Sequence, residues 1–183
     1  MNNNNVAVVL KDLIFVEKLK KGHIGECIVK EKFSEMYPYY DILEHKKNKA
    51  HWVDFTAMNK KNKDILYCEV KTKKRFEKYL STGFDIKHYK EYISLHYDTK
   101  KEILIYFVDD EHEDIRVLPI TKAIKLEEQN KSFKDYKNKI ISFKLQDMNF
   151  VGYIPDNYKK KLTDVNIKIK ILSTIYDNIR GTK

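Results

Sequence analysis

The sequence predicts an α/β fold in which a central mixed β-sheet is flanked by helices and followed by a C-terminal extension. A chain of 183 residues with 42% hydrophobic residues is long enough to bury one sizeable core. Helical and strand-like hydrophobic periods follow one another in the order helix, strands, helix, strands, which is typical of mixed α/β layers. With five glycines, three prolines and no internal repeat, the chain has no flexible linker, so one continuous domain is expected.

The first 36 residues predict two helices. Apolar residues recur at helical spacing over residues 6–19, until two lysines and Gly22 interrupt the pattern. A second helix is expected over residues 23–36, with Gly22, Gly25 and Glu26 on the stripe that packs inward. The two glycines would let the helix backbone approach its neighbour closely, and Glu26 would carry a carboxylate toward the core.

The rest of the core is predicted as strands around one helix. An antiparallel meander is expected from three extended segments, and a break at Ser81-Thr82-Gly83 precedes a helix and two more strands. The ranges are 39–43, 52–58 and 64–71 for the meander, 85–97 for the helix, and 103–108 and 115–120 for the later strands.

The C-terminal part gives weaker signals. A short helix to about residue 129 and a strand over residues 139–145 are expected. The apolar residues Val165, Ile167, Ile169 and Ile171 then alternate before the pattern becomes helical, which fits an edge strand, a dimerisation element or a DNA-binding appendage. We therefore divide the chain into a core of residues 1–130 and an extension of residues 131–183 that packs on the same domain.

The charge of the chain is compatible with a nucleic-acid partner. Its formal net charge is +9, from 36 basic and 27 acidic residues, and only three of the basic residues are arginines. Lysine suits phosphate oxygens, whereas arginine is the usual reader of guanine edges, so contacts to the backbone are favoured over base reading. A coding bias toward lysine gives the same composition, so charge alone does not establish such a partner.

The cysteines and the N-terminus indicate the compartment. Cys27 and Cys68 are isolated from each other, which offers neither a CxxC metal site nor a disulfide framework and fits a reducing cytoplasm. The longest early apolar run, residues 6–10, is far too short to span a membrane. We expect a cytoplasmic protein without membrane attachment.

A reactive strand face is predicted at residues 65–71. The period of two places Glu69 and Lys71 on one side with Tyr67, while Leu66, Cys68 and Val70 point the other way. Asp54 belongs to the preceding strand, and a short hairpin would bring its carboxylate next to that of Glu69. ExK occurs often by chance and each residue alone fits an ordinary charged strand, so the hypothesis depends on their combination.

Clustered carboxylates repel one another unless a cation offsets their charge. Asp54, Glu69 and the main-chain carbonyl of Val70 are hard oxygen ligands suited to Mg²⁺, for which Mn²⁺ can substitute. Such a site would stabilise charge on a scissile phosphate and help to ionise an attacking water. Lys71 would hold that water, and Glu26 would bind the metal through water or complete a second metal position.

The motifs of the chain resemble those of the PD-(D/E)XK nucleases, in particular archaeal Holliday-junction resolvases and phage or restriction-type endonucleases. The resemblance covers about residues 20–120 and rests on Lys21-Gly-His-Ile-Gly-Glu26, Trp52-Val-Asp54 and Glu69-Val-Lys71-Thr-Lys73. It implies a restriction-endonuclease-like core and a Mg²⁺-dependent endodeoxyribonuclease that acts on duplex or branched DNA, with catalytic roles for Glu26, Asp54, Glu69 and Lys71. Val53 replaces the proline of the motif, and His88 or Tyr89 stands where many members carry a glutamine.

Partners and alternatives complete the set of expectations. Six basic residues flank the reactive strands and are candidates for gripping phosphates: Lys46, Lys47, Lys49, Lys73, Lys74 and Arg75. A homodimer is expected, because cutting two strands usually requires two symmetry-related sites. The alternatives are a non-catalytic nucleic-acid-binding module, an RNA endonuclease with His23 or His51 near the metal, and a structural ion pair of the acids with Lys71.

Overall fold

The computed structural model describes residues 3–45 and 52–181. Its helices are α1 (Asn3–Met36), α2 (Ile86–Thr99), α3 (Ile120–Glu128) and α4 (Asp156–Gly181). Its strands are β1 (Tyr40–Glu44), β2 (Phe55–Asn59), β3 (Ile65–Thr72), β4 (Ser81–Asp85), β5 (Glu102–Asp109), β6 (Asp114–Pro119), β7 (Ser132–Asp135), β8 (Ile140–Lys144) and β9 (Asn149–Tyr153). Two short 3-10 helices are η1 (Glu77–Tyr79) and η2 (Leu145–Asp147).

The described strands form two sheets. The main sheet has the order β1-β2-β3-β5-β6-β9, and a three-stranded sheet has the order β4-β8-β7. In the main sheet only β3 and β5 run parallel, and the other neighbours are antiparallel. The predicted mixed sheet and its antiparallel meander are therefore confirmed, and α2 supplies the crossover that a parallel pair requires.

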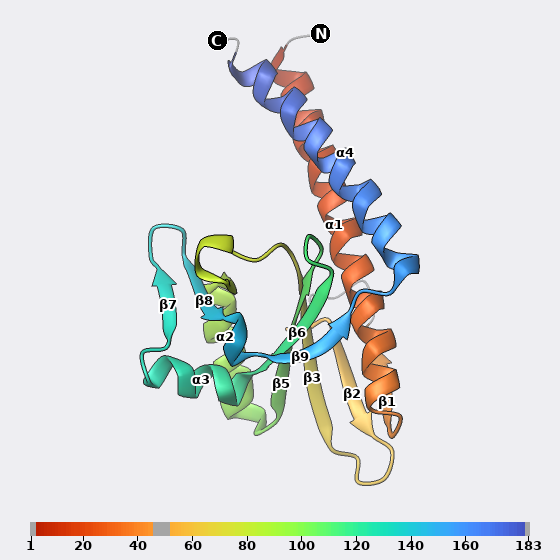
Figure 1. Cartoon of the computed structure of the whole chain (residues 1–183), viewed down its shortest axis with the longest axis vertical. Coiled ribbons are helices and arrows are strands. Elements are labelled where there is room, and N and C mark those ends of the chain that lie inside the picture. The colour runs from red at the N-terminus through yellow and green to blue at the C-terminus, as the bar shows by residue number, and fades with distance from the viewer. Residues whose placement is uncertain (1–2, 46–51, 182–183) are drawn as a thin grey trace.

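Each face of the main sheet has its own apolar core. Alternate residues of β3 and β5 point to opposite faces, so Cys68 and Val70 pack with Phe33 of α1, whereas Ile103 and Ile105 pack with side chains of α2, α3 and the small sheet. The reactive face predicted for β3 lies on the α2 side. Figure 1 shows α1 on one side of the sheet and α2 and α3 on the other.

The prediction of two N-terminal helices was wrong, because α1 runs unbroken through Gly22. A glycine inside a helix costs only about 1 kcal/mol, which tertiary contacts can offset. One such contact lies next to Gly22, where the ammonium of Lys21 binds the buried carboxylate of Asp110 at 2.7 Å. Asn166 of α4 donates to the same carboxylate, so the β5–β6 turn holds both long helices.

The tail predicted from alternating isoleucines is helix α4, which packs along α1. Figure 1 shows the two helices extending together well beyond the sheets. Val165 faces α1 and is 7% exposed, whereas Ile167 and Ile171 are on the outer side and are about half exposed. The edge-strand interpretation of this tail is therefore wrong.

Gly25 brings α1 close to β3, as predicted. A Cβ at this position would lie 1.7 Å from the hydroxyl oxygen of Thr72, so a side chain cannot be accommodated without a shift of the helix. Gly22 has no such neighbour, because a Cβ there would meet nothing within 4 Å. Gly25 alone therefore makes the close helix approach that was predicted for both glycines, and it does so beside Thr72 at the end of the reactive strand.

The segment Ser81-Thr82-Gly83 is strand β4, not the predicted break. It pairs with β8, and a Cβ at Gly83 would lie 2.0 Å from the carbonyl oxygen of Ile141. The glycine therefore permits a close strand contact and does not interrupt the fold.

Residues after 130 contribute to both sheets, since β7 and β8 complete the small one and β9 pairs with β6. No helix within the described ranges is both long and apolar enough to cross a membrane.

Candidate active site

The β2–β3 hairpin places Asp54 beside Glu69. The strands pair in a register that puts Phe55 opposite Cys68. One residue earlier, the Asp54 amide donates to the Cys68 carbonyl at 3.1 Å, and the Asp54 carboxylate accepts a 2.7 Å hydrogen bond from the Val70 amide. This bond fixes the carboxylate at the end of β2, against the backbone of the ExK segment.

Glu69 and Lys71 project from the same face of β3, as the alternation predicted. Their side chains form an ion pair, and the Glu69 side chain is only 8% exposed. The Tyr92 hydroxyl of α2 also hydrogen bonds to Glu69. Burial and the Glu69 charge both raise the pKa of Tyr92, so its hydroxyl stays protonated and donates to the carboxylate.

These groups line one solvent-open cleft of about 430 Å³. Asp54, Glu69 and Lys71 line it, and the remaining lining side chains are Trp52, His88, Glu91 and Tyr92. A cleft of this size admits a phosphate with part of its nucleoside. The structure therefore brings together three of the four residues predicted to be catalytic.

The cleft acids repel each other. The pKa of Asp54 is raised from 3.8 to about 6, first by burial and then by the charge of Glu69, and the Val70 amide and Lys71 offset only part of this effect. Lys71 is paired with Glu69, which leaves Asp54 without an equivalent cationic partner in the described structure. Such a pair of acids costs folding free energy, and strongly perturbed carboxyls in a cleft are typical of functional sites.

The oxygen atoms of the cleft are suited to bind a hard divalent cation. Since the amide and carbonyl of one strand residue point to the same edge, the Val70 carbonyl lies on the Asp54 side of β3, near both carboxylates. The described residues contain no group of three His, Cys, Asp or Glu side chains that could hold a metal ion. Two carboxylates with one carbonyl leave most positions to water, which suits Mg²⁺ better than a metal that needs a full set of protein ligands.

Glu26 lies close to this site without lining the cleft. It comes from α1, on the opposite face from Glu69, and its pKa is raised by burial and by the charge of Asp54. Lys30 lowers the pKa of both acids and was not singled out in the sequence. His23 is 3.8 Å from Glu26 on an exposed, mid-helical position, so its predicted place at a helix start was wrong. His51 lies outside the described residues.

Several solved structures resemble this chain, and they include the following two. One is described as Hjc, a Holliday junction resolvase from the archaeal hyperthermophile Archaeoglobus fulgidus, with a TM-score of 0.46, 10% identity, and coverage of 69% of this chain and 96% of that one. The other is described as D212, a nuclease from a fusselovirus, with a TM-score of 0.47, 14% identity, and coverage of 83% and 89%. No family model and no curated protein matches the sequence.

The candidate phosphate-binding residues have different surroundings. Lys46, Lys47 and Lys49 lie outside the described residues. Lys73 is half-buried and donates to the Gly83 carbonyl, and burial together with Lys71 lowers its pKa. Lys74 is exposed and forms a 3.7 Å ion pair with Glu111. Among the candidates that lie within the described residues, Lys74 is the one whose ammonium is open to a phosphate.

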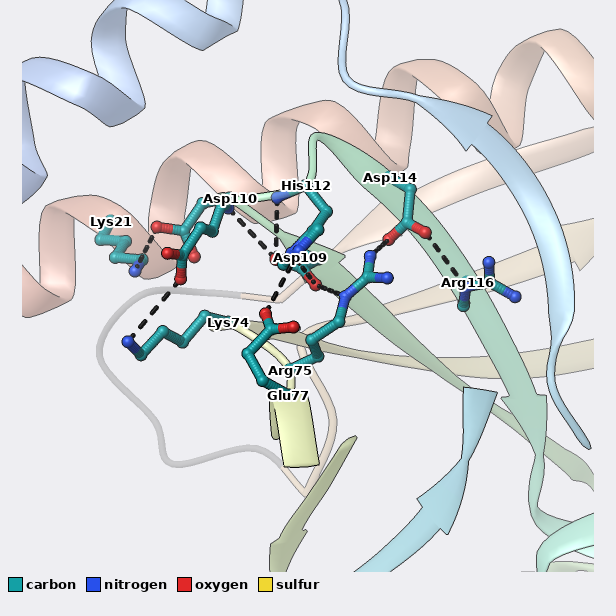
Figure 2. Close-up of polar contacts among 10 residues, drawn as sticks. Lys21, Lys74, Arg75, Glu77, Asp109, Asp110, His112, Asp114 and Arg116 are labelled. Carbon is teal, nitrogen blue, oxygen red and sulfur yellow. Dashed lines mark hydrogen bonds and ion pairs between the residues drawn. The ribbon is translucent and has the colours of Figure 1, made fainter. Parts of the chain in front are cut away.

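Arg75 is bound inside the protein. Its guanidinium pairs with Asp109 and, at 2.9 Å, with Asp114, and the three side chains are 7–11% exposed. Arg116 pairs with Asp114 as well, and Figure 2 shows this chain of ion pairs. Arg116 also donates to the Leu145 carbonyl, so this network fastens the main sheet to the residues that follow β8. The contacts assign Arg75 to structure, and its side chain does not line the cleft.

Of the three cleft residues that α2 contributes, the sequence pointed only to His88, through the motif resemblance. His88, Glu91 and Tyr92 have the spacing i, i+3, i+4, which places them on one side of the helix. That spacing is visible in the sequence, but the sequence does not show that side chains of this helix reach the reactive strand. Tyr92 is 3% exposed, and its hydroxyl reaches Glu69.

Proposed function

We propose that the chain is a metal-dependent endonuclease that hydrolyses phosphodiester bonds in DNA. The observation that carries this proposal is the pair of mutually repelling carboxylates, Asp54 and Glu69, held beside Lys71 in an open cleft. A structural ion pair with Lys71 needs only one acid. The second acid lowers the stability of the fold unless a cation binds in the cleft and offsets its charge. Hydrolysis of a phosphodiester also needs a metal cation, which stabilises the charge on the phosphate.

Each residue has a defined role in this proposal. Asp54, Glu69 and the Val70 carbonyl would hold Mg²⁺, with Mn²⁺ as a substitute, and the ion would offset charge on the phosphate and lower the pKa of a bound water. The Lys71 ammonium would donate to the attacking water or to a phosphoryl oxygen. Tyr92 keeps Glu69 oriented through its hydroxyl, and Glu26 adds negative charge behind Asp54.

DNA is the proposed substrate because lysines dominate the +9 charge and suit a phosphate backbone. Branched DNA is included because the sequence motifs resemble those of junction resolvases. An RNA endonuclease remains the second candidate, since His88 lines the cleft and offers an imidazole near the acids. We place the protein in the cytoplasm, as its unpaired cysteines suggest.

The test is cleavage of labelled duplex, single strand, flap, four-way junction and RNA, with Mg²⁺, Mn²⁺ or EDTA. Wild type is compared with Glu69→Gln and Lys71→Met, and the matched controls are the exposed positions Glu35→Gln and Lys61→Met. Metal-dependent cutting that both cleft variants lose and both controls keep supports the proposal. Cutting that survives both cleft variants, or duplex binding without any cutting, contradicts it, and cutting confined to RNA selects the second candidate.

We also propose a homodimer formed through the outer surface of α1. Six apolar side chains there are 43–61% exposed: Val8, Val9, Leu13, Phe15, Val16 and Leu19. The buried positions Leu10 and Glu17 lie on the other side of the helix, which α4 covers. The six side chains expose on the order of 600 Å² of apolar surface, most of the roughly 800 Å² that one partner brings to a stable interface.

Sedimentation equilibrium tests the dimer independently of cleavage. Wild type is expected at twice the chain mass of 21.9 kDa, and Leu13→Glu combined with Val16→Glu is expected at that mass. Lys18→Glu, an exposed position on the same helix, serves as the control that should remain dimeric. A monomeric wild type at micromolar concentration would refute the dimer and leave the nuclease proposal untouched.

A further inference from the structure

The small sheet carries a pair of stacked aromatic rings in contact with solvent. Tyr79 of η1 and Phe133 of β7 have ring centroids 6.0 Å apart and an angle of 22° between their planes. The two side chains are nevertheless 58% and 62% exposed. Large aromatic side chains normally gain stability by burial, so a parallel pair held in water presents flat surfaces to a ligand.

Two hollows share this ring pair in their lining. One has a volume of about 460 Å³ and includes Ser81, Lys131 and Lys144 in its lining. The other, of about 370 Å³, is largely apolar and includes Phe76, Lys78 and Ile140. Both hollows are bounded by Tyr79, Phe133 and Ser142, so a planar group in either one would lie against an aromatic ring. Each volume is in the range of small-molecule sites.

The charges of the larger hollow favour an anionic ligand. Lys131 and Lys144 line it, against the single carboxylate of Asp147 in its described lining. The smaller hollow holds Lys78, whose ammonium lies 5.3 Å from the Tyr79 ring, together with the carboxylates of Glu77 and Asp135. These two carboxylates are held by protein groups, since Glu77 lies 3.2 Å from His112 and Asp135 accepts hydrogen bonds from Asn138.

We propose that the Tyr79–Phe133 pair binds unpaired bases of a nucleic-acid strand, with Lys78, Lys131 and Lys144 contacting its phosphates. Flat rings interleaved with cations are the chemistry by which single strands are bound without sequence preference. Bases inside a duplex have both faces covered by their neighbours, so only an unpaired base can enter a hollow and stack on a ring. The inference deepens the proposed nuclease function by naming a single-stranded portion of its substrate.

The position of the ring pair fits a strand that also enters the cleft. Eight residues separate Lys71 in the cleft from Tyr79, so the two sites are at most about 28 Å apart, because an extended chain spans about 3.5 Å per residue. That distance corresponds to about eight stacked nucleotides. The small sheet also leads directly into α2, whose His88 lines the cleft.

The experiment is fluorescence anisotropy with a labelled oligothymidylate of about twelve nucleotides, in EDTA so that no cleavage occurs. An abasic oligonucleotide of equal length and a blunt duplex are the comparison ligands. Tyr79→Ala and Phe133→Ala are tested against Tyr136→Ala, an aromatic residue that is 75% exposed on the β7–β8 turn and lines neither hollow. Tyr79→Phe and Phe133→Leu separate ring stacking from general apolar contact and guard against misfolding.

We expect each alanine variant to bind oligothymidylate at least fivefold more weakly, by about the effect of losing one stacked base. Tyr136→Ala and Tyr79→Phe should bind like wild type, Phe133→Leu should bind like Phe133→Ala, and the abasic strand should bind like the variants. Three outcomes would overturn the inference. The alanine variants could lose as much affinity for the abasic strand as for the normal one, Tyr136→Ala could also lose affinity, or the wild type could bind no single strand. Because metal is absent, a failed nuclease assay leaves these results unaffected.

Discussion

Replacing Asp54 with asparagine should stabilise the metal-free protein. The pKa of this carboxyl is about 6 in the folded chain and ordinarily 3.8, so the folded state holds the proton more tightly than the unfolded state does. Protonation therefore favours folding. The contribution of Asp54 to the free energy of unfolding should be highest near pH 4 and below, decline as the pH rises from about 4 to 6, and stay low above that range.

The magnitude follows from the same values. Each tenfold change in proton affinity is worth about 1.36 kcal/mol, so a pKa raised from 3.8 to about 6 corresponds to about 3 kcal/mol of lost stability at neutral pH. Because the cleft is open to solvent, we expect about 2 kcal/mol. Asparagine has nearly the same shape and its side-chain oxygen can still accept from the Val70 amide, so the substitution removes the charge and keeps the hydrogen bond.

Urea unfolding in EDTA, followed by circular dichroism, measures this effect. Asp54→Asn should exceed wild type by about 2 kcal/mol at pH 8 and equal it within about 0.5 kcal/mol at pH 4, while cleavage is lost. Asp41→Asn, at a carboxylate that is 51% exposed, is the control and should change stability by less than about 0.5 kcal/mol at either pH. A loss of stability in Asp54→Asn that is the same at both pH values would refute the electrostatic argument.

Three further outcomes are expected. Arg75→Met should lower the free energy of unfolding by about 3–5 kcal/mol in urea titrations, because it removes the guanidinium that the buried aspartates Asp109 and Asp114 share. Lys74→Met should change it by less than about 0.5 kcal/mol, and a loss below about 1 kcal/mol for Arg75→Met would exclude the structural role. Tyr92→Phe keeps the ring but removes the hydrogen bond from the Tyr92 hydroxyl to Glu69. Single-turnover cleavage should therefore slow roughly tenfold with unchanged substrate affinity, and an unchanged rate would argue against this positioning role. Mg²⁺ at about 100 times its dissociation constant should raise the free energy of unfolding of wild type by about 2.7 kcal/mol, measured by urea unfolding. The gain should be much smaller in Asp54→Asn, and equal gains in the two proteins would place the ion elsewhere.

Local patterns were sufficient to predict the meander and the centre of the site. Strand alternation put Glu69 and Lys71 on one face, and the short turn between β2 and β3 brought Asp54 to them. Both features depend on neighbours within about 15 residues of each other. Their geometry follows from the period of a strand and the length of a hairpin, which a sequence displays directly.

Contacts between distant segments explain the errors. Gly22 was interpreted as a helix end because nothing in the sequence shows that Asp110 and α4 hold that turn. Gly83 was interpreted as a break because its partner strand lies almost 60 residues away. Arg75 was assigned to phosphate binding because its two aspartate partners are recognisable only once β5 and β6 are paired. Local propensity is overridden wherever such distant partners supply the missing contact.

The pairing of α1 with α4 has a consequence for how the protein reaches its native state. During synthesis the first helix emerges early, and the helix that covers it is the last part of the described chain to appear. Until α4 has been synthesised, Leu10 and the neighbouring apolar residues of α1 lack the helix against which they pack. Since contacts between the two ends of a chain close the longest loop and slow folding, the two-helix arm should form last, after the sheets. A nascent chain of this protein would therefore be most vulnerable to aggregation at the helix that was made first.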